Sequence, residues 1–214
     1  WRFNRLDFYA ALPASDSTGS APGFYVEHIA YPQIDNADSP QVLAWNRAVE
    51  KNIAQGNDGE DADSDTDTDY EIGEANGHII SVQWTAYEYD HGAAHGLYTI
   101  DTQNLILFPN LRPLTATDLF GTDKHWAKKV QDVFWRALLA NGWTPPDNQP
   151  ESVKDQIGIE VIRPDKWLVT KDGLQVSFSA YEGGCYACNP GPVTASWTDL
   201  QPLLAPTAIT DVRW

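Results

Sequence analysis

The chain has 214 residues and a formal net charge of −16, with 30 Asp and Glu residues against 14 Lys and Arg residues. This length can bury a sizeable core, and it fits one domain or two small packed lobes. The charge argues against nucleic acid as a partner, because phosphates are repelled; it suits solubility, cationic proteins or metal cations. No apolar run approaches the roughly 20 residues that cross a bilayer. The chain lacks Met and begins with Trp1, so we expect any signal peptide or anchor to have been removed, or never to have existed.

The first elements along the chain are a predicted strand, a helix and an acidic segment. Residues 23–31 are rich in aromatic and β-branched side chains, which predicts a strand that Pro32 ends. A Ser-Pro pair at 39–40 and apolar residues at spacings of three and four predict a helix that Gly56 ends. The repeated aspartates of residues 57–69 repel one another and lack the spacing of a calcium-binding EF-hand. We therefore expect a mobile, solvated loop, with weak cation binding as the alternative.

The middle of the chain predicts a hairpin and a long helix. Residues 80–87 alternate apolar and polar side chains, as a half-buried antiparallel strand does. Strands over 97–100 and 105–107 follow, with a turn at 101–104 between them. A wide apolar stripe over 123–141 predicts a strongly amphipathic helix that lies across one face of the sheet.

The remaining chain is expected to hold a polar linker over 145–152, strands over 157–162, 167–169, 174–180 and 193–197, and a short helix over 198–204. Strands that pair as hairpins, with two helices interposed, predict the α+β class. We expect a mainly antiparallel sheet with a long amphipathic helix and a second helix packed on one face. Two lobes are expected to pack as one unit: a strand-helix lobe over 1–70 that ends in the acidic loop, and a carboxy-terminal domain over 71–214.

The chain has two cysteines, in the sequence Cys185-Tyr186-Ala187-Cys188. Two thiols exclude a four-cysteine zinc site within one chain. A thioredoxin-type redox pair should open a helix, and Asn189-Pro190-Gly191-Pro192 argues against one. A short-loop disulfide in an oxidising compartment is therefore favoured over free thiols and over a redox pair.

Two histidines stand in the turn after the first predicted hairpin strand. His91 and His95 have the spacing of a zinc-binding pair, because side chains four apart share one face of a helix. Gly92 and Gly96 indicate a turn instead, where His95 would fix the backbone by hydrogen bonds. We expect no cofactor and assign no metal ligand, and we keep a metal-dependent hydrolase that uses both histidines as the alternative.

Aromatic side chains supply the candidate binding surface. Tyrosines suit interfaces because they are rigid and amphipathic. Those on the polar phase of strands or in turns are the better candidates for exposure than tryptophans on apolar faces. With the two turn histidines, the candidate binding residues are Tyr87, Tyr89, His91, His95, Tyr98, Tyr181 and Tyr186.

An ordered series of short blocks resembles the RsiV/PdaC-type extracytoplasmic domain family. The blocks are Ile79-Ile80-Ser81-Val82 with Tyr87, Gly92-Ala93-Ala94-His95-Gly96, Leu114 with Asp118-Leu119-Phe120, Trp167 with Asp172-Gly173-Leu174, Phe178-x-x-Tyr181, Tyr186-Ala187, Gly191-Pro192-Val193, and Leu200. Tyr31-Pro32-Gln33-Ile34 resembles the companion domain that precedes it. The two cysteines depart from the family, whose members more often carry small or apolar residues there.

The resemblance implies work at the cell envelope. One relative is the ectodomain of an anti-sigma factor that binds lysozyme, and another is a non-catalytic region of a peptidoglycan deacetylase. We therefore expect a periplasmic or secreted, non-enzymatic binding domain that recognises lysozyme, as a cationic protein, or cell-wall glycan. The alternative above, a metal-dependent hydrolase of cell-wall glycan, belongs to a different class of function.

Overall fold

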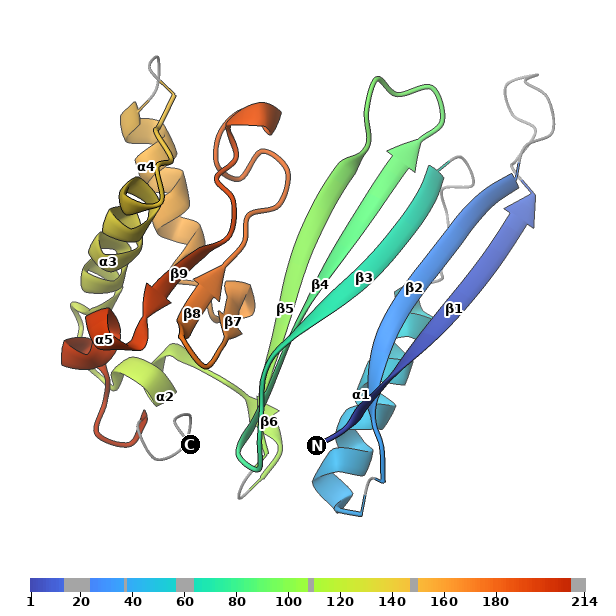
Figure 1. Ribbon diagram of the computed structural model, residues 1–214, viewed down its shortest axis with the longest axis horizontal. Helices are drawn as coiled ribbons and strands as arrows, with labels where there is room; N and C mark the ends of the chain where they lie inside the picture. Colours follow the sequence, from blue (N-terminus) through green and yellow to red (C-terminus); the bar gives the residue numbers. More distant parts are fainter. Residues whose placement is uncertain (14–23, 37, 57–63, 108–109, 147–149, 209–214) are drawn as a thin grey trace. The chain divides into compact units, whose positions relative to one another are not determined.

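The computed structural model describes residues 1–13, 24–36, 38–56, 64–107, 110–146 and 150–208 (Figure 1). The strands are β1 (Phe3–Pro13), β2 (Phe24–Ile34), β3 (Ser64–Ala75), β4 (Ile79–Asp90), β5 (Leu97–Ile106), β6 (Arg112–Pro113), β7 (Trp167–Val169), β8 (Gly173–Val176) and β9 (Val193–Ser196). The α-helices are α1 (Pro40–Gly56), α2 (Ala116–Phe120), α3 (Trp126–Ala140), α4 (Pro150–Glu160) and α5 (Trp197–Leu200), and the 3-10 helices are η1 (Pro164–Lys166), η2 (Tyr186–Cys188) and η3 (Gln201–Leu203). Within the described residues, no helix combines the length and apolarity that crossing a bilayer requires.

The strands form two sheets. Six strands follow one another in the order β1-β2-β3-β4-β5-β6, and the other three in the order β7-β8-β9. Strands β1 and β2 pair antiparallel along their whole length, whereas β2 and β3 pair in parallel over three residues, Glu27 to Ile29. The small sheet is antiparallel throughout. The predicted α+β class with a mainly antiparallel sheet is confirmed, with two sheets.

Backbone contacts divide the chain into two compact units. The first comprises Trp1–Tyr70 and Trp84–Thr99, and the second comprises Glu71–Gln83 and Ile100–Trp214. The predicted lobes, which divide the chain once after residue 70, differ from these units in the placement of residues 84–99. Strands β3, β4 and β5 therefore each contribute residues to both units.

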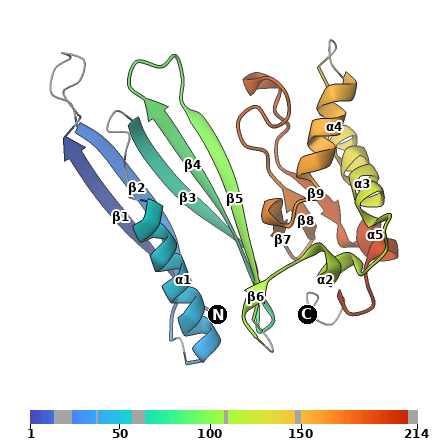
Figure 2. The same cartoon turned by 180° about the vertical axis from the view of Figure 1, so that it is seen from behind.

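Helix α1 covers one face of the β1–β2 hairpin in the first unit (Figures 1 and 2). Ser39 begins it as predicted, because its hydroxyl oxygen accepts a hydrogen bond from the backbone N–H of Val42 at 3.2 Å. Val42, Trp45 and Val49 are buried, and the Phe3 ring meets the Trp45 ring edge-on at 6.0 Å. The predicted helix and its apolar stripe are confirmed.

Strand β2 does not end at Pro32, as the sequence predicts, but continues to Ile34. Pro32 lies opposite Arg5 of β1. Proline cannot donate a backbone hydrogen bond, so it is tolerated where a strand has a neighbour on one side only. The pairing of β2 with β3 stops at Ile29, so Pro32 needs a partner only toward β1.

The prediction of a loop over residues 57–69 is wrong for residues 64–69. Residues 57–63 lie outside the described part of the chain, but β3 begins at Ser64. Asp65, Asp67 and Asp69 alternate along this strand, and each binds a group outside it. The aspartates stand at every second residue, which is the side-chain period of a strand. Their hydrogen-bond partners elsewhere in the first unit offset the repulsion between the like charges.

Helix α3 supplies much of the second core, as its apolar stripe predicts. Val130, Phe134 and Leu138 are almost fully buried. Helices α3 and α4 lie side by side, and α3 packs on β9 (Figures 1 and 2). The centroids of the Trp167 and Trp126 rings are 6.2 Å apart, and the Trp126 ring stacks on the Phe120 ring. An aromatic cluster therefore ties α2, α3 and β7 together.

The predicted strand over residues 157–162 is wrong, because most of this segment belongs to α4 or to the turn after it. Val153, Ile157 and Val161 recur at spacings of four and are all buried. This helical period is present in the sequence, but the β-branched run at 157–162 disguises it. Helix α4 also occupies the end of the predicted linker.

The predicted turn at residues 101–104 is also wrong, because β5 runs through it. Thr102 and Asn104 suggest a turn by their polarity, yet both are buried. The Thr102 hydroxyl accepts a hydrogen bond from the Gln83 side chain at 3.0 Å. Ser81 and Gln83, predicted on the polar phase of their strand, are buried as well. Partners that are distant in sequence make these polar side chains compatible with burial.

Asn104 and Ser81 join the two sheets within the second unit. The Asn104 amide donates to the backbone carbonyls of Pro164 and Trp167, and its oxygen accepts from the Ser81 hydroxyl at 2.6 Å. The Ser81 oxygen in turn accepts from the backbone N–H of Val169 at 2.8 Å. These side chains therefore pair with backbone groups of η1 and β7.

We expect Asn104→Ala to lower the free energy of unfolding by about 2–4 kcal/mol, because it leaves several buried polar groups without partners. Urea denaturation measures the loss. Asn4→Ala, at an exposed position of β1, is the matched control and should change stability by less than about 0.5 kcal/mol. Equal effects of the two variants would contradict the role assigned to Asn104.

Candidate recognition site

The candidate site is residues 179–190, which lie within the segment between β8 and β9 and are here called the Cys loop. Cys185 and Cys188 form a disulfide with Cα atoms 4.8 Å apart, which confirms the predicted bond. Tyr181 and Tyr186, two of the candidate binding residues, lie in this loop. Their ring centroids are 5.7 Å apart, and the ring planes are inclined by 59°.

Lys166 anchors the beginning of the Cys loop. Its side chain is buried, and the ammonium group donates to the Ile100 carbonyl at 3.1 Å, the Ser179 hydroxyl at 3.1 Å and the Glu182 carboxylate at 2.7 Å. An ammonium group has three hydrogens, so these three acceptors satisfy it completely. The second Glu182 oxygen accepts from the backbone N–H of Ser179. The buried charge is thus fully paired, and it fixes the loop to β5 and η1.

The contact between Lys166 and Ser179 resembles a base beside a nucleophile, but the geometry favours a structural role. The hydrogens of Lys166 are all committed, so it presents no lone pair to the hydroxyl. The Ser179 oxygen also accepts from the backbone N–H of Ile100 at 2.9 Å. Both side chains are more than nine-tenths buried, which keeps substrates away from the hydroxyl.

A second ionic group lies beside this anchor on α4 and η1. Arg163 donates to Glu160 at 2.9 Å and to Asp165 at 2.6 Å. Burial raises the pKa of the Glu160 carboxyl, and the nearby Glu182 carboxylate adds to the rise. Its hydrogen bonds to Arg163 lower the pKa of Asp165. These charges bind the elements that carry Lys166.

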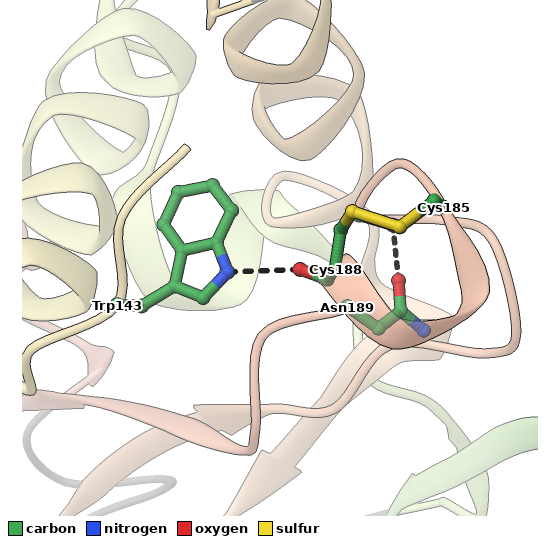
Figure 3. Close-up of a disulfide and its surroundings, with 5 residues drawn as sticks. Trp143, Cys185, Cys188 and Asn189 are labelled. Carbon is green, nitrogen blue, oxygen red and sulfur yellow. Dashed lines mark hydrogen bonds between the residues drawn. A yellow bond between two sulfur atoms is a disulfide. The ribbon is translucent and has the colours of Figure 1, made fainter. Parts of the chain in front are cut away.

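Asn189 and Trp143 hold the far end of the Cys loop. The Asn189 amide donates to the backbone carbonyls of Phe178 and Ser179, and its oxygen accepts from the backbone N–H of Gly183. The Trp143 indole N–H donates to the Cys188 carbonyl at 3.0 Å, as Figure 3 shows beside the disulfide. Side chains from three parts of the second unit therefore fix the loop backbone.

The backbone of the Cys loop takes conformations that only tight packing retains. Tyr181 has a φ of 69°, in the left-handed region that non-glycine residues seldom occupy. A Cβ atom on Gly183 would lie 2.2 Å from the Pro190 ring, so this position requires glycine. Residues held in such conformations at a surface often mark functional sites. Tyr181 is 45% exposed, so the strained position displays a large aromatic side chain.

The other five candidate binding residues lie in the first unit, on β4, β5 and the turn between them: Tyr87, Tyr89, His91, His95 and Tyr98. Tyr87 is 43% exposed. The Tyr89 hydroxyl donates to the Ala93 carbonyl at 3.2 Å, so it partly closes the turn. These five residues therefore gather at one hairpin, whereas Tyr181 and Tyr186 belong to the second unit.

The two turn histidines have different partners. The Nε2 atom of His91 lies 3.0 Å from a carboxylate oxygen of Asp65, and the Nδ1 atom of His95 lies 3.0 Å from the Gly96 carbonyl. The second contact is the hydrogen bond to the turn backbone that the sequence predicts for His95. Among the residues that the structure describes, no three His, Cys, Asp or Glu side chains form a group that could hold a metal ion.

Sequence reasoning did not find the anchors of the Cys loop. Lys166 lies between the predicted strands over 157–162 and 167–169, and nothing nearby in the sequence indicates that it is buried. The pair Gly183-Gly184 was the available signal, since adjacent glycines often mark a tight, unusual backbone. The anchoring residues come from η1, the segment after α3 and the loop itself, so their convergence is a property of the tertiary fold.

Two solved structures share the fold of this chain. No family model matches the sequence, and no curated protein matches it. A DUF3298-family protein from Bacteroides fragilis is 16% identical, with a TM-score of 0.63, over 99% of this chain and 96% of that chain. A DUF3298-family protein from Pseudomonas aeruginosa is 14% identical, with a TM-score of 0.64, over 97% and 95% respectively. The fold is therefore of the DUF3298 type.

We expect Lys166→Met to lower the free energy of unfolding by about 3–5 kcal/mol, because it leaves the Glu182 carboxylate and two further acceptors without their donor. Hydrogen exchange of the Cys loop should accelerate in the same variant. Lys171→Met, at an exposed turn position, is the matched control and should stay within about 0.5 kcal/mol of wild type. A loss below about 1 kcal/mol in Lys166→Met would show that the buried ammonium is not the anchor.

Proposed function

We propose that this chain is a non-enzymatic recognition domain of the cell envelope, in the periplasm or outside the cell, of the RsiV/PdaC type. Its partner in this proposal is a cationic, wall-attacking protein such as lysozyme. The Cys loop makes the central contact through Tyr181 and Tyr186. The observation that carries the proposal is an exposed tyrosine held at a φ of 69° in a loop that is fixed from both ends.

A fixed loop supports recognition because its conformational entropy is already lost in the free protein, before the partner binds. A flexible loop loses conformational freedom on binding, at about 0.5–1.5 kcal/mol for each immobilised side chain. The Cys loop is held by Lys166, Asn189 and the disulfide, so its free and bound conformations need not differ. Tyrosine suits the centre of such an interface, since its ring buries much area and its hydroxyl can still hydrogen-bond.

The net charge supports a cationic partner. A charge of −16 attracts a basic protein over distances comparable to the Debye length, about 10 Å at 0.1 M salt. Such attraction raises the association rate more than it raises the affinity. Cell-wall glycan is the second candidate ligand, because the inclined tyrosine pair offers a ring face on which a sugar could stack.

The disulfide supports the proposed location. Disulfides persist in oxidising environments such as the periplasm and the extracellular space. Cys185 is exposed, so a reducing cytosol would have access to the bond. The bond therefore fits a chain that works outside the cytoplasm.

Calorimetry against hen-type lysozyme tests the proposed partner. We expect binding heat at low salt. In stopped-flow mixing, the association rate should fall about tenfold or more between 25 and 250 mM salt, because screening removes the steering. Soluble peptidoglycan fragments, titrated separately, test the glycan candidate. Heat with neither ligand at either salt concentration would retire the proposal.

Two variants of the Cys loop locate the contact. Tyr181→Asn and Tyr186→Ser should each weaken binding about tenfold or more, as for a tyrosine at the centre of an interface. Asparagine tolerates a positive φ, so Tyr181→Asn should keep the fold. Tyr9→Ser is the matched control, at a 67% exposed tyrosine outside both candidate groups. Tyr87→Ser reports whether the β4–β5 hairpin also contributes; unchanged binding in both Cys-loop variants would exclude this loop as the contact.

A further inference from the structure

One histidine in the first unit is held between two carboxylates from different strands. The Nδ1 atom of His28, in β2, lies 2.6 Å from an Asp67 oxygen of β3. Its Nε2 atom lies 3.0 Å from an Asp7 oxygen of β1. The Tyr9 ring stacks on the imidazole, with centroids 4.5 Å apart and planes inclined by 16°. The side chain of His28 is only 19% exposed.

These contacts lie where the β1–β2 hairpin meets β3. The two strands β2 and β3 pair over three residues, and His28 opposite Asp67 is the middle pair. Two other aspartates of β3 hold the same hairpin: Asp65 accepts from the backbone N–H of Val26 at 2.8 Å, and Asp69 accepts from the Arg5 guanidinium at 2.6 Å. Side chains therefore supplement a very short ladder of backbone hydrogen bonds.

The proton count of the imidazole decides how many of these contacts are hydrogen bonds. A protonated imidazole donates from both ring nitrogens and can bind Asp67 and Asp7 together. A neutral imidazole has one N–H, so one of the two carboxylates then faces a lone pair. The arrangement of His28 between two carboxylates is complete only in the charged form.

We propose that protonated His28 is a pH-sensitive clasp that locks the β1–β2 hairpin to strand β3, and that the lock loosens when the imidazole loses its proton. The clasp is independent of what the Cys loop binds, because every residue in it belongs to the first unit.

The carboxylates that contact His28 favour its protonated form, and they outweigh the opposing effect of burial. Hydrogen bonds to Asp67 and then to Asp7 raise the pKa of His28 above its ordinary value of 6.5. Asp69, also of β3, interacts with the imidazole through its charge. Arg5 is the nearby cation, and it is neutralised by Asp69 and Asp7.

Helix α1 also packs against β2, and the hydrogen bonds that its described side chains make with the strand involve Gln33 and Ile34. They run through Asn46, which accepts from the Ile34 backbone N–H and donates to the Ile34 carbonyl, and whose own carbonyl accepts from Gln33. The groups that set the charge state of His28 therefore come from β1 and β3.

The raised pKa fixes the sign of the effect. A histidine whose folded-state pKa exceeds its unfolded value stabilises the fold fully below the unfolded value, and this stabilisation is lost as the pH rises through the folded value. On the acid side, the hydrogen bond to His28 lowers the pKa of Asp7 below its ordinary 3.8, so the clasp persists down to that region. The clasp is thus closed in mildly acidic surroundings and open in alkaline ones.

Hydrogen exchange of the full chain at pH 5.5 and pH 8.5, corrected for intrinsic rates, tests the clasp. In wild type, protection of residues 27–29 and 66–68 should fall about threefold or more between the two pH values. In His28→Gln this difference should vanish. His78→Gln, which removes an exposed imidazole, is the control and should keep the wild-type difference.

Two further measurements keep the test decisive if His28→Gln folds poorly. Asp67→Asn retains the side-chain size but removes the carboxylate, and it too should abolish the difference. An NMR titration of wild type should place the His28 pKa above 6.5. A wild-type pH difference that persists in Asp67→Asn, or a His28 pKa at or below 6.5, would overturn the proposal.

Discussion

The conformation of the Cys loop, the proposed recognition surface, depends on one buried ammonium group. Lys166 lies in a short 3-10 helix, and its three hydrogens join β5, the first residue of the Cys loop and the acid that follows Tyr181. Burying a lysine is costly unless every hydrogen finds an acceptor, so the position tolerates little displacement. The hydrogen bonds of Lys166 therefore fix the positions of Ser179 and Glu182, which lie on either side of Tyr181 in the chain. Asn189 and the Trp143 indole then close the other end.

The two units use charge in opposite ways. In the second unit the buried ion pair of Lys166 and Glu182 ties the Cys loop to η1. In the first unit, partly exposed aspartates of β3 hold the β1–β2 hairpin through an arginine and a histidine, and the histidine can lose its charge. Solvent screens the partly exposed contacts of the hairpin more than the buried pair of Lys166 and Glu182.

Local patterns in the sequence predicted the α+β class, helices α1 and α3, the disulfide and the hydrogen bond of His95. Each of these follows from spacing within a short segment, such as the stripe through Val42, Trp45 and Val49. The errors occurred where a distant partner reverses a local preference: Asn104 looked like a turn residue until Ser81 and the carbonyls of η1 and β7 satisfied it. Lys166 could not have been found, because its three acceptors lie 13 to 66 residues away.

The most direct test of the account is the backbone order of the Cys loop in the free protein. NMR order parameters for the amides of residues 179–189 should match those of β7, β8 and β9, near 0.85, because side chains hold the loop at both ends before any partner binds. Values below about 0.6 at Tyr181 and Tyr186 would contradict a preformed recognition surface.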